Sequence, residues 1–183
     1  MKEVSKMLKR IPNTTNIKVF SREAIEKACA AGLKKKTAII SITDVFAPLA
    51  DIGPMFNVQG DMIKPIPENL VNILRLQFDD VFEDEDAAMV RADADDIAEL
   101  IYNTEFEELW IHCEGGVSRS AAVAAAISKH LYGDDMWVFQ NPNYYPNMWV
   151  NKLTTEALGD EWDWEEFKRK LNINIQIYNE RCD

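Results

Sequence analysis

An apolar segment, a nine-residue loop and an alanine-rich segment follow one another without interruption in this chain. Residues 109–111 read LWI and are typical of a buried strand, whereas residues 121–132 read AAVAAAISKHLY and are typical of a helix. Between them, residues 112–120 read HCEGGVSRS. A strand that passes through a glycine-containing loop into a helix is the unit from which parallel sheets are built, so this stretch favours an α/β fold.

The remainder of the chain alternates in the same way. Residues 37–43, TAIISIT, are apolar and β-branched throughout, as in strands that are covered on both faces. Ser21 and Gly32 flank a helical pattern as N-cap and stop signal, and Gly133 ends the alanine-rich helix. Strands are predicted over residues 17–20, 37–43, 72–78 and 109–113, and helices over 21–32, about 84–103, 121–132, 148–158 and 162–180.

These patterns predict a single domain over residues 1–183. Its central sheet is expected to be mainly parallel and covered by helices on both faces. A chain of 183 residues with 47% hydrophobic content can build one well-buried core and is short for two. Residues 44–69 are rich in proline and glycine and are predicted to form a long surface loop, with at most a short irregular strand.

The charge of the chain limits its partners. A formal net charge of −11 repels both nucleic-acid backbones and anionic membrane surfaces, so neither is an expected partner. No run of apolar residues is long enough to span a bilayer, and the basic start is followed by no apolar secretory segment. A cytoplasmic location is therefore expected, and the oligomeric state is unknown.

Cysteine and histidine are both scarce. The cysteines, Cys29, Cys113 and Cys182, are too few and too scattered for a disulfide framework or a zinc site. The two histidines, His112 and His130, further weaken a metal site. No cofactor or metal is expected, and a lone cysteine beside a histidine instead raises the question of reactivity.

The loop after the predicted strand 109–113 has the properties of an anion site. Ligands of parallel sheets bind where strands end and helices begin. Gly115 and Gly116 allow successive backbone N–H groups to turn inward, and the helix that starts near Arg119 adds its positive end. The Arg119 guanidinium can hold two phosphoryl oxygens at once. In this field Cys113 is expected to be a thiolate, and so a nucleophile aimed at phosphorus.

His112, Cys113 and Arg119 stand in the order HCx5R, which resembles the signature of the Cys-based protein tyrosine phosphatase superfamily. With Gly116 inside the loop and Ser120 after the arginine, the motif is similar to the compact dual-specificity branch. The resemblance implies a dual-specificity phosphatase-like fold. It also implies hydrolysis of a phosphomonoester through a cysteinyl-phosphate intermediate, without a metal.

The resemblance covers about residues 37–132 and implies a general acid upstream of the motif. Phe78, Asp79 and Asp80 end the predicted strand 72–78 and are similar to the FDD or FED segment of compact phosphatases, in which the later Asp is the acid. The leaving oxygen needs such a group because it departs poorly unless protonated. Asp80 is favoured over Asp79, and both stay candidates.

The resemblance also implies a role for each remaining site residue. Cys113 attacks phosphorus, Asp80 serves first as acid and then as base, and Ser120 stabilises the departing thiolate. His112 shapes the loop and helps to keep the pKa of the thiol low. The substrate-binding loop consists of Glu114, Gly115, Gly116, Val117, Ser118 and Arg119.

Several alternatives stay open. A rhodanese-like sulfurtransferase also has a cysteine before a helix but does not need the upstream acid, and a phosphate-binding module usually lacks one of the key residues. Phosphoproteins, small phosphomonoesters and 5′-phosphorylated RNA ends are all candidate substrates. Lipid substrates are less favoured because the loop has no lysine and Glu114 would repel a multiply phosphorylated headgroup. Residues 141–147, NPNYYPN, are predicted to pack their tyrosines on the core, the alternative being that they line the pocket.

Overall fold

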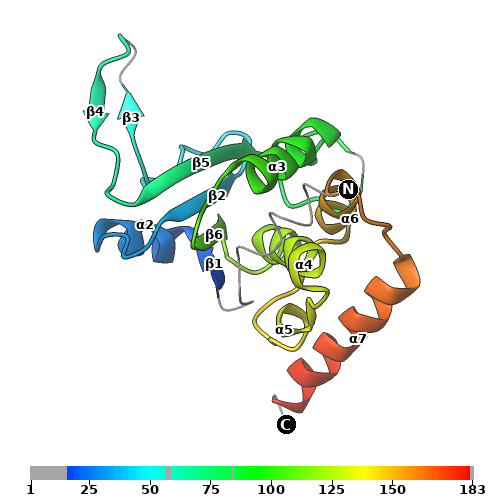
Figure 1. Ribbon diagram of the computed structural model, residues 1–183. Helices are drawn as coiled ribbons and strands as arrows, with labels where there is room; N and C mark the ends of the chain where they lie inside the picture. Colours follow the sequence, from blue (N-terminus) through cyan, green and yellow to red (C-terminus); the bar gives the residue numbers. More distant parts are fainter. Residues whose placement is uncertain (1–15, 57–58, 84, 182–183) are drawn as a thin grey trace.

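The computed structural model describes residues 16–56, 59–83 and 85–181. Cys182 lies outside these residues. The central sheet has four strands in the order β1-β6-β2-β5, and every pair of neighbours is parallel, as predicted. The strands are β1 (Ile17–Ser21), β2 (Thr37–Thr43), β5 (Leu70–Gln77) and β6 (Glu108–Cys113). Figure 1 shows the sheet at the centre of the molecule.

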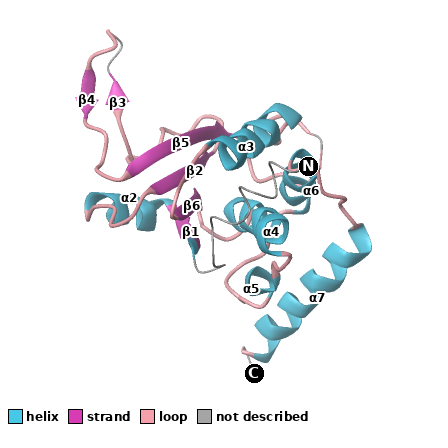
Figure 2. Cartoon of the chain, viewed as in Figure 1, coloured by secondary structure: helices cyan, strands magenta, loops and turns pink. Residues whose placement is uncertain are grey.

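Helices cover both faces of this sheet (Figures 1 and 2). On one face lies α2 (Arg22–Ala30), and on the other lie α3 (Arg91–Asn103), α4 (Arg119–Tyr132) and α6 (Met148–Ala157). Beyond α4 follow the short α5 (Met136–Phe139) and the long α7 (Trp164–Glu180). Among the described residues, no helix is long and apolar enough to cross a membrane.

Alternation along the strands produces two apolar clusters. In β2, Ile40 and its neighbours two positions away point toward α3 and α4, whereas Ile39 points toward α2. In β6, Ile111 and Cys113 belong to the first cluster and Trp110 to the second. Because consecutive residues of β6 serve opposite faces, Cys113 at its end faces the α4 side of the sheet.

The predicted start of the helix over about 84–103 is wrong by about seven residues, because α3 begins at Arg91 rather than near residue 84. The acidic run before it forms turns instead, with Ala87 in the left-handed region at φ 67° and its carbonyl bonded to the amide of Asp79 at 2.7 Å. The first turn of α3 contains Asp93, whose carboxylate accepts from the amide of Val90. The acidic residues thus belong to the loop that leaves β5.

A short strand pair and a short helix in the described part of the chain lie outside the predicted set. Within the predicted loop 44–69, β3 (Met55–Phe56) and β4 (Met62–Lys64) form an antiparallel pair that projects from the body of the molecule (Figure 1). The four-residue helix α5 was not predicted, because one turn is too short for periodicity to reveal it.

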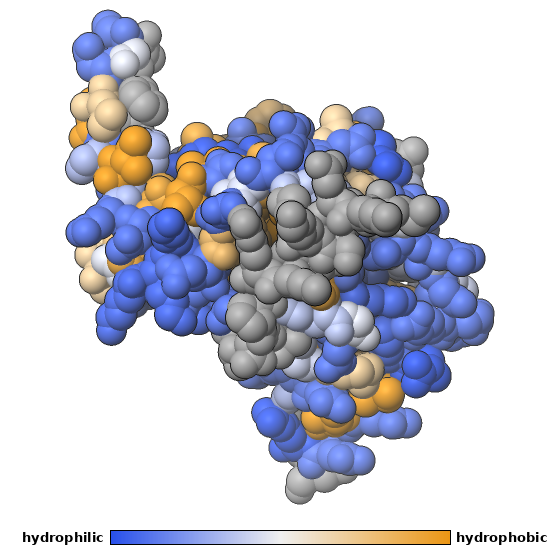
Figure 3. Space-filling model, viewed as in Figure 1, coloured by the Kyte–Doolittle hydropathy of each residue, from blue (hydrophilic) through white to orange (hydrophobic). Residues whose placement is uncertain are grey.

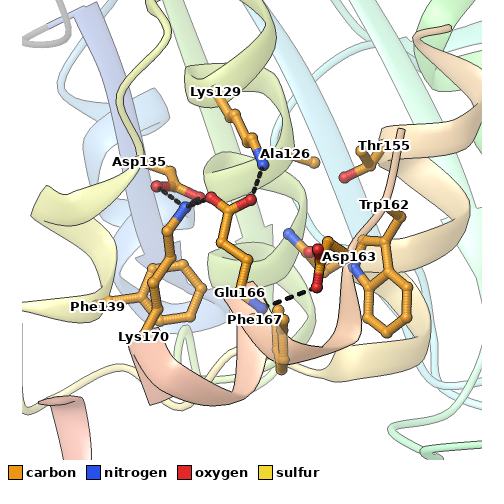
Figure 4. Close-up of a pocket in the computed structure, with 11 residues that line it drawn as sticks. Ala126, Lys129, Asp135, Phe139, Thr155, Trp162, Asp163, Glu166, Phe167 and Lys170 are labelled. Carbon is orange, nitrogen blue, oxygen red and sulfur yellow. Dashed lines mark hydrogen bonds and ion pairs between the residues drawn. The ribbon is translucent and has the colours of Figure 1, made fainter. Parts of the chain in front are cut away.

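Helix α7 is fastened to the body by one buried and one half-buried ion pair (Figure 4). The ammonium group of Lys170 lies 2.6 and 2.8 Å from the two carboxylate oxygens of Asp135 and 2.6 Å from Glu166, and Lys129 of α4 lies 2.8 Å from the same glutamate. Lys129 and Lys170 lower the pKa of Glu166 to about 2. Helix α7 is thereby held against α4 and the start of α5.

Candidate active site

The sulfur of Cys113 lies at the carboxyl end of β6, with 2% of the residue exposed. The Ser120 hydroxyl, from the first turn of α4, lies 3.1 Å from Sγ and is fully buried. A hydroxyl at this distance can donate a hydrogen bond to a sulfur that carries negative charge. The two residues are thus adjacent, although seven positions separate them in the sequence.

The loop between β6 and α4 packs directly against the end of β1. Gly116 has φ 69°, and a Cβ atom there would lie 2.5 Å from the amide nitrogen of Ser21 and 2.6 Å from the carbonyl carbon of Phe20. A side chain is therefore excluded at Gly116 both by space and by backbone conformation. At Gly115, by contrast, a Cβ atom would meet only a methyl group of Val117, at 3.8 Å.

The backbone amides of this loop have no acceptor among the described residues. Within the described part of the chain, no amide of residues 114–119 donates a hydrogen bond to a backbone or side-chain acceptor. Several carbonyls of the loop do accept, including those of Val117 and Ser118. The loop is thus fixed through its acceptors, and its donors stand free at the N-terminus of the 14-residue helix α4. Such an arrangement favours an anion.

One side of the Arg119 guanidinium is anchored and the other is free. Its Nη1 lies 2.6 Å from the carbonyl oxygen of Phe78 and 2.7 Å from the carboxylate of Asp44. Its Nε is buried without a hydrogen-bond partner, and Nη2 has none among the described residues. Nε and Nη2 lie on the same edge of the guanidinium, which is the edge that binds an oxyanion in bidentate fashion.

The two candidate acids have different surroundings. Oδ1 of Asp80 accepts hydrogen bonds from the Ser118 hydroxyl at 2.9 Å and from the Asn147 amide at 2.8 Å. Its Oδ2 has no partner in the described part of the chain. The carboxylate of Asp79 instead accepts from the backbone amide of Val45 at 3.1 Å, in the turn after β2. Asp80 is therefore the carboxylate that contacts the loop of Cys113.

His112 lies on the opposite face of β6 from Cys113 and is fully buried. Its Nε2 lies 2.8 Å from the Ser41 hydroxyl, and its Nδ1 lies 3.4 Å from the carbonyl oxygen of Cys113. Burial, with a smaller contribution from nearby Arg22, lowers the pKa of His112 to about 4. At pH 7 the ring is neutral, so it positions the strand end and brings no positive charge to the thiol.

Other loop side chains point away from the centre of the site. The Glu114 carboxylate pairs with Arg22 at 3.0 Å, which offsets the charge that was expected to repel multiply phosphorylated groups. Val117 is exposed, and its carbonyl accepts from the amide of Tyr145 at 2.9 Å. Of the two adjacent tyrosines, Tyr144 packs on the core as predicted, whereas Tyr145 is exposed.

Two residues of the site were missed by sequence reasoning. Asn147 is fully buried, caps α6 through the amide of Val150, and binds both Asp80 and the carbonyl of Val81. An asparagine just before a helix signals a cap, but nothing in its spacing signals a contact with Asp80. Asp44 directly follows β2, at the same sheet edge as Cys113, and that position was a usable signal.

Comparison with family models, curated proteins and solved structures finds no match for this chain. Within the described residues, no three or more His, Cys, Asp or Glu side chains are grouped so that they could hold a metal ion. What the site can do must therefore follow from its own groups. These are a buried thiol beside a hydroxyl, a loop of free amides, a half-anchored arginine and a carboxyl group within reach of the loop.

Proposed function

We propose that the protein hydrolyses phosphomonoesters through a cysteinyl-phosphate intermediate and is a dual-specificity-like protein phosphatase. The observation that carries the proposal is the pairing of unsatisfied donors with a nucleophile. In the described part of the chain, the amides of residues 114–119 and the Nε of Arg119 have no acceptor, and all of them belong to the loop that begins at Cys113. The Nε of Arg119 is a buried donor without a partner among the described residues, which is costly, so the site favours a ligand rich in acceptors, such as a phosphoryl group.

In the first step, Cys113 Sγ attacks phosphorus. An S–P bond forms as the P–O bond to the leaving group breaks, and the Oδ2 proton of Asp80 moves to the leaving oxygen. Arg119 and the loop amides hold the three equatorial oxygens, so charge that builds up in the transition state meets fixed donors. Ser118 and Asn147 hold Asp80 by its other oxygen.

In the second step, water replaces the sulfur on phosphorus. Asp80, now ionised, takes a proton from the water as its oxygen bonds to phosphorus. The S–P bond breaks and its electron pair returns to Cys113 as a thiolate, which accepts a hydrogen bond from Ser120. Inorganic phosphate leaves, and Asp80 is protonated again for the next turnover.

The contact between Asp80 and the loop favours hydrolysis over the two alternatives. Sulfur transfer does not need an acid next to the cysteine loop, and a pure phosphate-binding module has no use for a carboxyl group there. The Ser118 hydroxyl donates a hydrogen bond to Asp80, which lies in the loop after β5, 33 residues before Cys113. Small phosphomonoesters and RNA 5′ ends are alternative substrates that an assay panel separates.

The proposed chemistry is tested with a simple aryl phosphate. We expect the purified protein to hydrolyse it in the presence of EDTA and to be inhibited by vanadate, which mimics five-coordinate phosphorus. Cys113→Ser should remove activity, whereas Cys29→Ala, on the opposite face of the sheet, should leave it nearly unchanged. Activity that disappears with EDTA and returns with a divalent ion would defeat the proposal.

The role of Asp80 is tested against Asp79 as its matched neighbour. We expect Asp80→Asn to lower kcat about 100-fold or more for a poor leaving group and much less for an activated one, because protonation matters only when departure is difficult. Asp79→Asn should cost far less, since Asp79 binds the Val45 amide. A leaving-group-dependent loss that follows Asp79 would reverse the assignment. If neither change matters, the general-acid step is wrong.

A further inference from the structure

A groove of about 520 Å³ opens beside the loop of Cys113. Val117 of the loop forms one wall, residues 142–145 form the second, and the C-terminal half of α7 forms the third through Ile175 and Tyr178. None of the lining residues is an acid, a lysine, an arginine or a histidine, although 28% of the chain is charged. In Figure 3, hydrophobic residues reach the surface over α7.

The apolar side chains of this groove are exposed to solvent. Val117, Tyr145, Ile175 and Tyr178 are each between 38% and 55% exposed, from three separate segments of the chain. Single exposed apolar residues are ordinary, but a concave cluster beside a reactive loop is typical of a binding surface. A volume of about 520 Å³ also lies within the range of ligand pockets, roughly 300–1,000 Å³.

The groove and the candidate phosphate site share a wall. Val117 belongs to the anion-binding loop, and its carbonyl accepts from the amide of Tyr145 on the second wall. The hydrogen bond from Asn174 of α7 to the carbonyl of Asn141, at 2.8 Å, joins the second wall to the third. Whatever is attached to a phosphoryl group in the loop therefore lies next to an apolar groove whose walls are bonded to one another.

We infer that this groove binds the polypeptide of a phosphorylated protein substrate, and takes an aromatic or large aliphatic side chain close to the phosphorylated residue. The inference rests on the proposed function and adds the part of the substrate that this groove binds, a large apolar side chain that flanks the phosphorylated residue. Tyr144, Tyr145 and Tyr178, with Asn143, give a surface of rings, hydroxyls and amides. Tyrosine and asparagine of this kind suit peptide recognition, because they offer contact area and hydrogen bonds together.

A membrane lipid fits the same groove less well. The net charge of −11 repels an anionic bilayer, and in a small phosphorylated metabolite there is little to fill about 520 Å³. A phosphopeptide places a flanking side chain beside the loop without bringing a charged surface with it. The chemistry of the groove therefore selects a flexible protein segment.

The experiment uses phosphopeptides in which one Phe is moved through each position flanking the phosphorylated residue in a glycine and serine background. We expect one position to raise kcat/KM about tenfold over the unsubstituted peptide, since a large apolar side chain becomes buried. Ile175→Ala and Tyr178→Ala should each remove most of that gain. Binding of the same peptides to Cys113→Ser should show the same preference without turnover.

Ile173→Ala provides the matched control. Ile173 lies on the same helix as Ile175 but lines a different, mostly polar groove with Arg169 and Gln176. This variant should retain the peptide preference, and Ile175→Ala, Tyr178→Ala and Ile173→Ala should all hydrolyse a simple aryl phosphate at the wild-type rate. The aryl phosphate rate distinguishes a loss of peptide binding in the groove from a loss of the chemical step.

The outcomes are distinct. Wild-type protein that hydrolyses neither aryl phosphate nor phosphopeptide overturns the proposed function, and the inference with it. Wild-type activity without a Phe preference, or an equal loss in Ile173→Ala and Ile175→Ala, overturns the groove alone. Two other results would also overturn the groove assignment. Faster hydrolysis of phosphatidic acid in vesicles that depends on Ile175 would mean that the groove binds a lipid. A dimer that Ile175→Ala dissociates would mean that the groove binds a second copy of the chain.

Discussion

The ring of His112 is a weak base buried inside the sheet, with the Ser41 hydroxyl as its side-chain partner. Its pKa falls from an ordinary 6.5 to about 4, chiefly because burial disfavours the charged ring. Above pH 6.5 the ring is neutral in both the folded and the unfolded chain. Between pH 6.5 and 4 only the unfolded chain takes up the proton, so the free energy of unfolding decreases as the pH falls.

We therefore expect acid to destabilise the protein through this one residue. The free energy of unfolding should fall by ~1.3 kcal/mol between pH 7.5 and 5.5 from His112 alone. Urea denaturation at the two pH values measures the change, and His112→Gln, which keeps a hydrogen-bonding side chain, should remove most of it. His130→Gln serves as the control and should retain it. An undiminished pH effect in His112→Gln would contradict the assignment.

The choice between Asp79 and Asp80 shows what can be predicted for single residues. For the proposed general acid, the sequence leaves two adjacent candidate carboxylates, because both follow the strand that ends near Phe78. Their roles differ through partners that are distant in sequence, the Val45 amide for Asp79 and Ser118 and Asn147 for Asp80. Local spacing contains no information about those partners. The sequence could therefore favour Asp80 over Asp79 but could not decide between them.

At the scale of elements, the loop between β6 and α4 depends on one of its two glycines. We expect Gly116→Ala to lower kcat/KM for an aryl phosphate roughly 100-fold, because the added methyl group would overlap Ser21 and push the loop amides out of place. Thermal unfolding should show a loss of about 1–3 kcal/mol.

Gly115→Ala is the matched control for this substitution. Its methyl group meets only Val117, at an ordinary contact distance of 3.8 Å. Activity and stability should stay close to those of the wild type. Equal losses in the two variants would mean that the loop needs flexibility at both positions, and that the close approach to Ser21 is not the reason for Gly116.

Elements were predictable where burial leaves a clear periodic pattern. The strand 37–43 was predicted with its exact bounds because every one of its residues is buried, and the pattern is correspondingly apolar. The start of α3 was misplaced because acidic residues suit both a first helical turn and a solvated loop. Ala87 adopts a left-handed backbone conformation that interrupts the helical pattern. Alanine does not favour this conformation, so the sequence does not signal the interruption.

At the scale of the whole molecule, α7 depends on the ion pair between Lys170 and Asp135. Both side chains are 8% exposed, and the removal of one partner leaves a buried charge uncompensated. We expect Lys170→Met to lower the free energy of unfolding by about 3–5 kcal/mol, measured by urea denaturation. Lys168→Met, an exposed position on the same helix, should change it by less than about 0.5 kcal/mol.

A double variant distinguishes a lost charge pair from lost packing. When Asp135→Asn is added to Lys170→Met, the unpaired carboxylate is removed as well, so a large part of the stability should return. A double variant that is less stable than Lys170→Met would show that the methylene groups of Lys170 matter more than its charge. Detachment of α7 should also abolish the peptide preference, because Ile175 and Tyr178 lie on this helix.

The contacts that join distant segments were beyond prediction from the sequence. Lys170 reaches Asp135 across 35 positions, and in a chain with 31 acidic residues no local pattern selects that partner. The same holds for residues 141–147, whose link to the loop of Cys113 depends on backbone hydrogen bonds. The sheet, its parallel direction and the helices on each side follow from periodicity, whereas the groove depends on how α7 packs beside residues 142–145 and Val117.

The order of strands also determines when, during synthesis of the chain, the sheet can be completed. Strand β1 lies at an edge and pairs with β6, so Ile17 meets Leu109 only after about ninety further residues have been made. At the pace of a ribosome, that wait is roughly 5–18 s. The backbone of Phe20 and Ser21, at the end of β1, also packs directly against Gly116. A nascent chain therefore emerges with β1 unpaired, and the loop between β6 and α4 can pack on β1 only after residues 108–119 have been made.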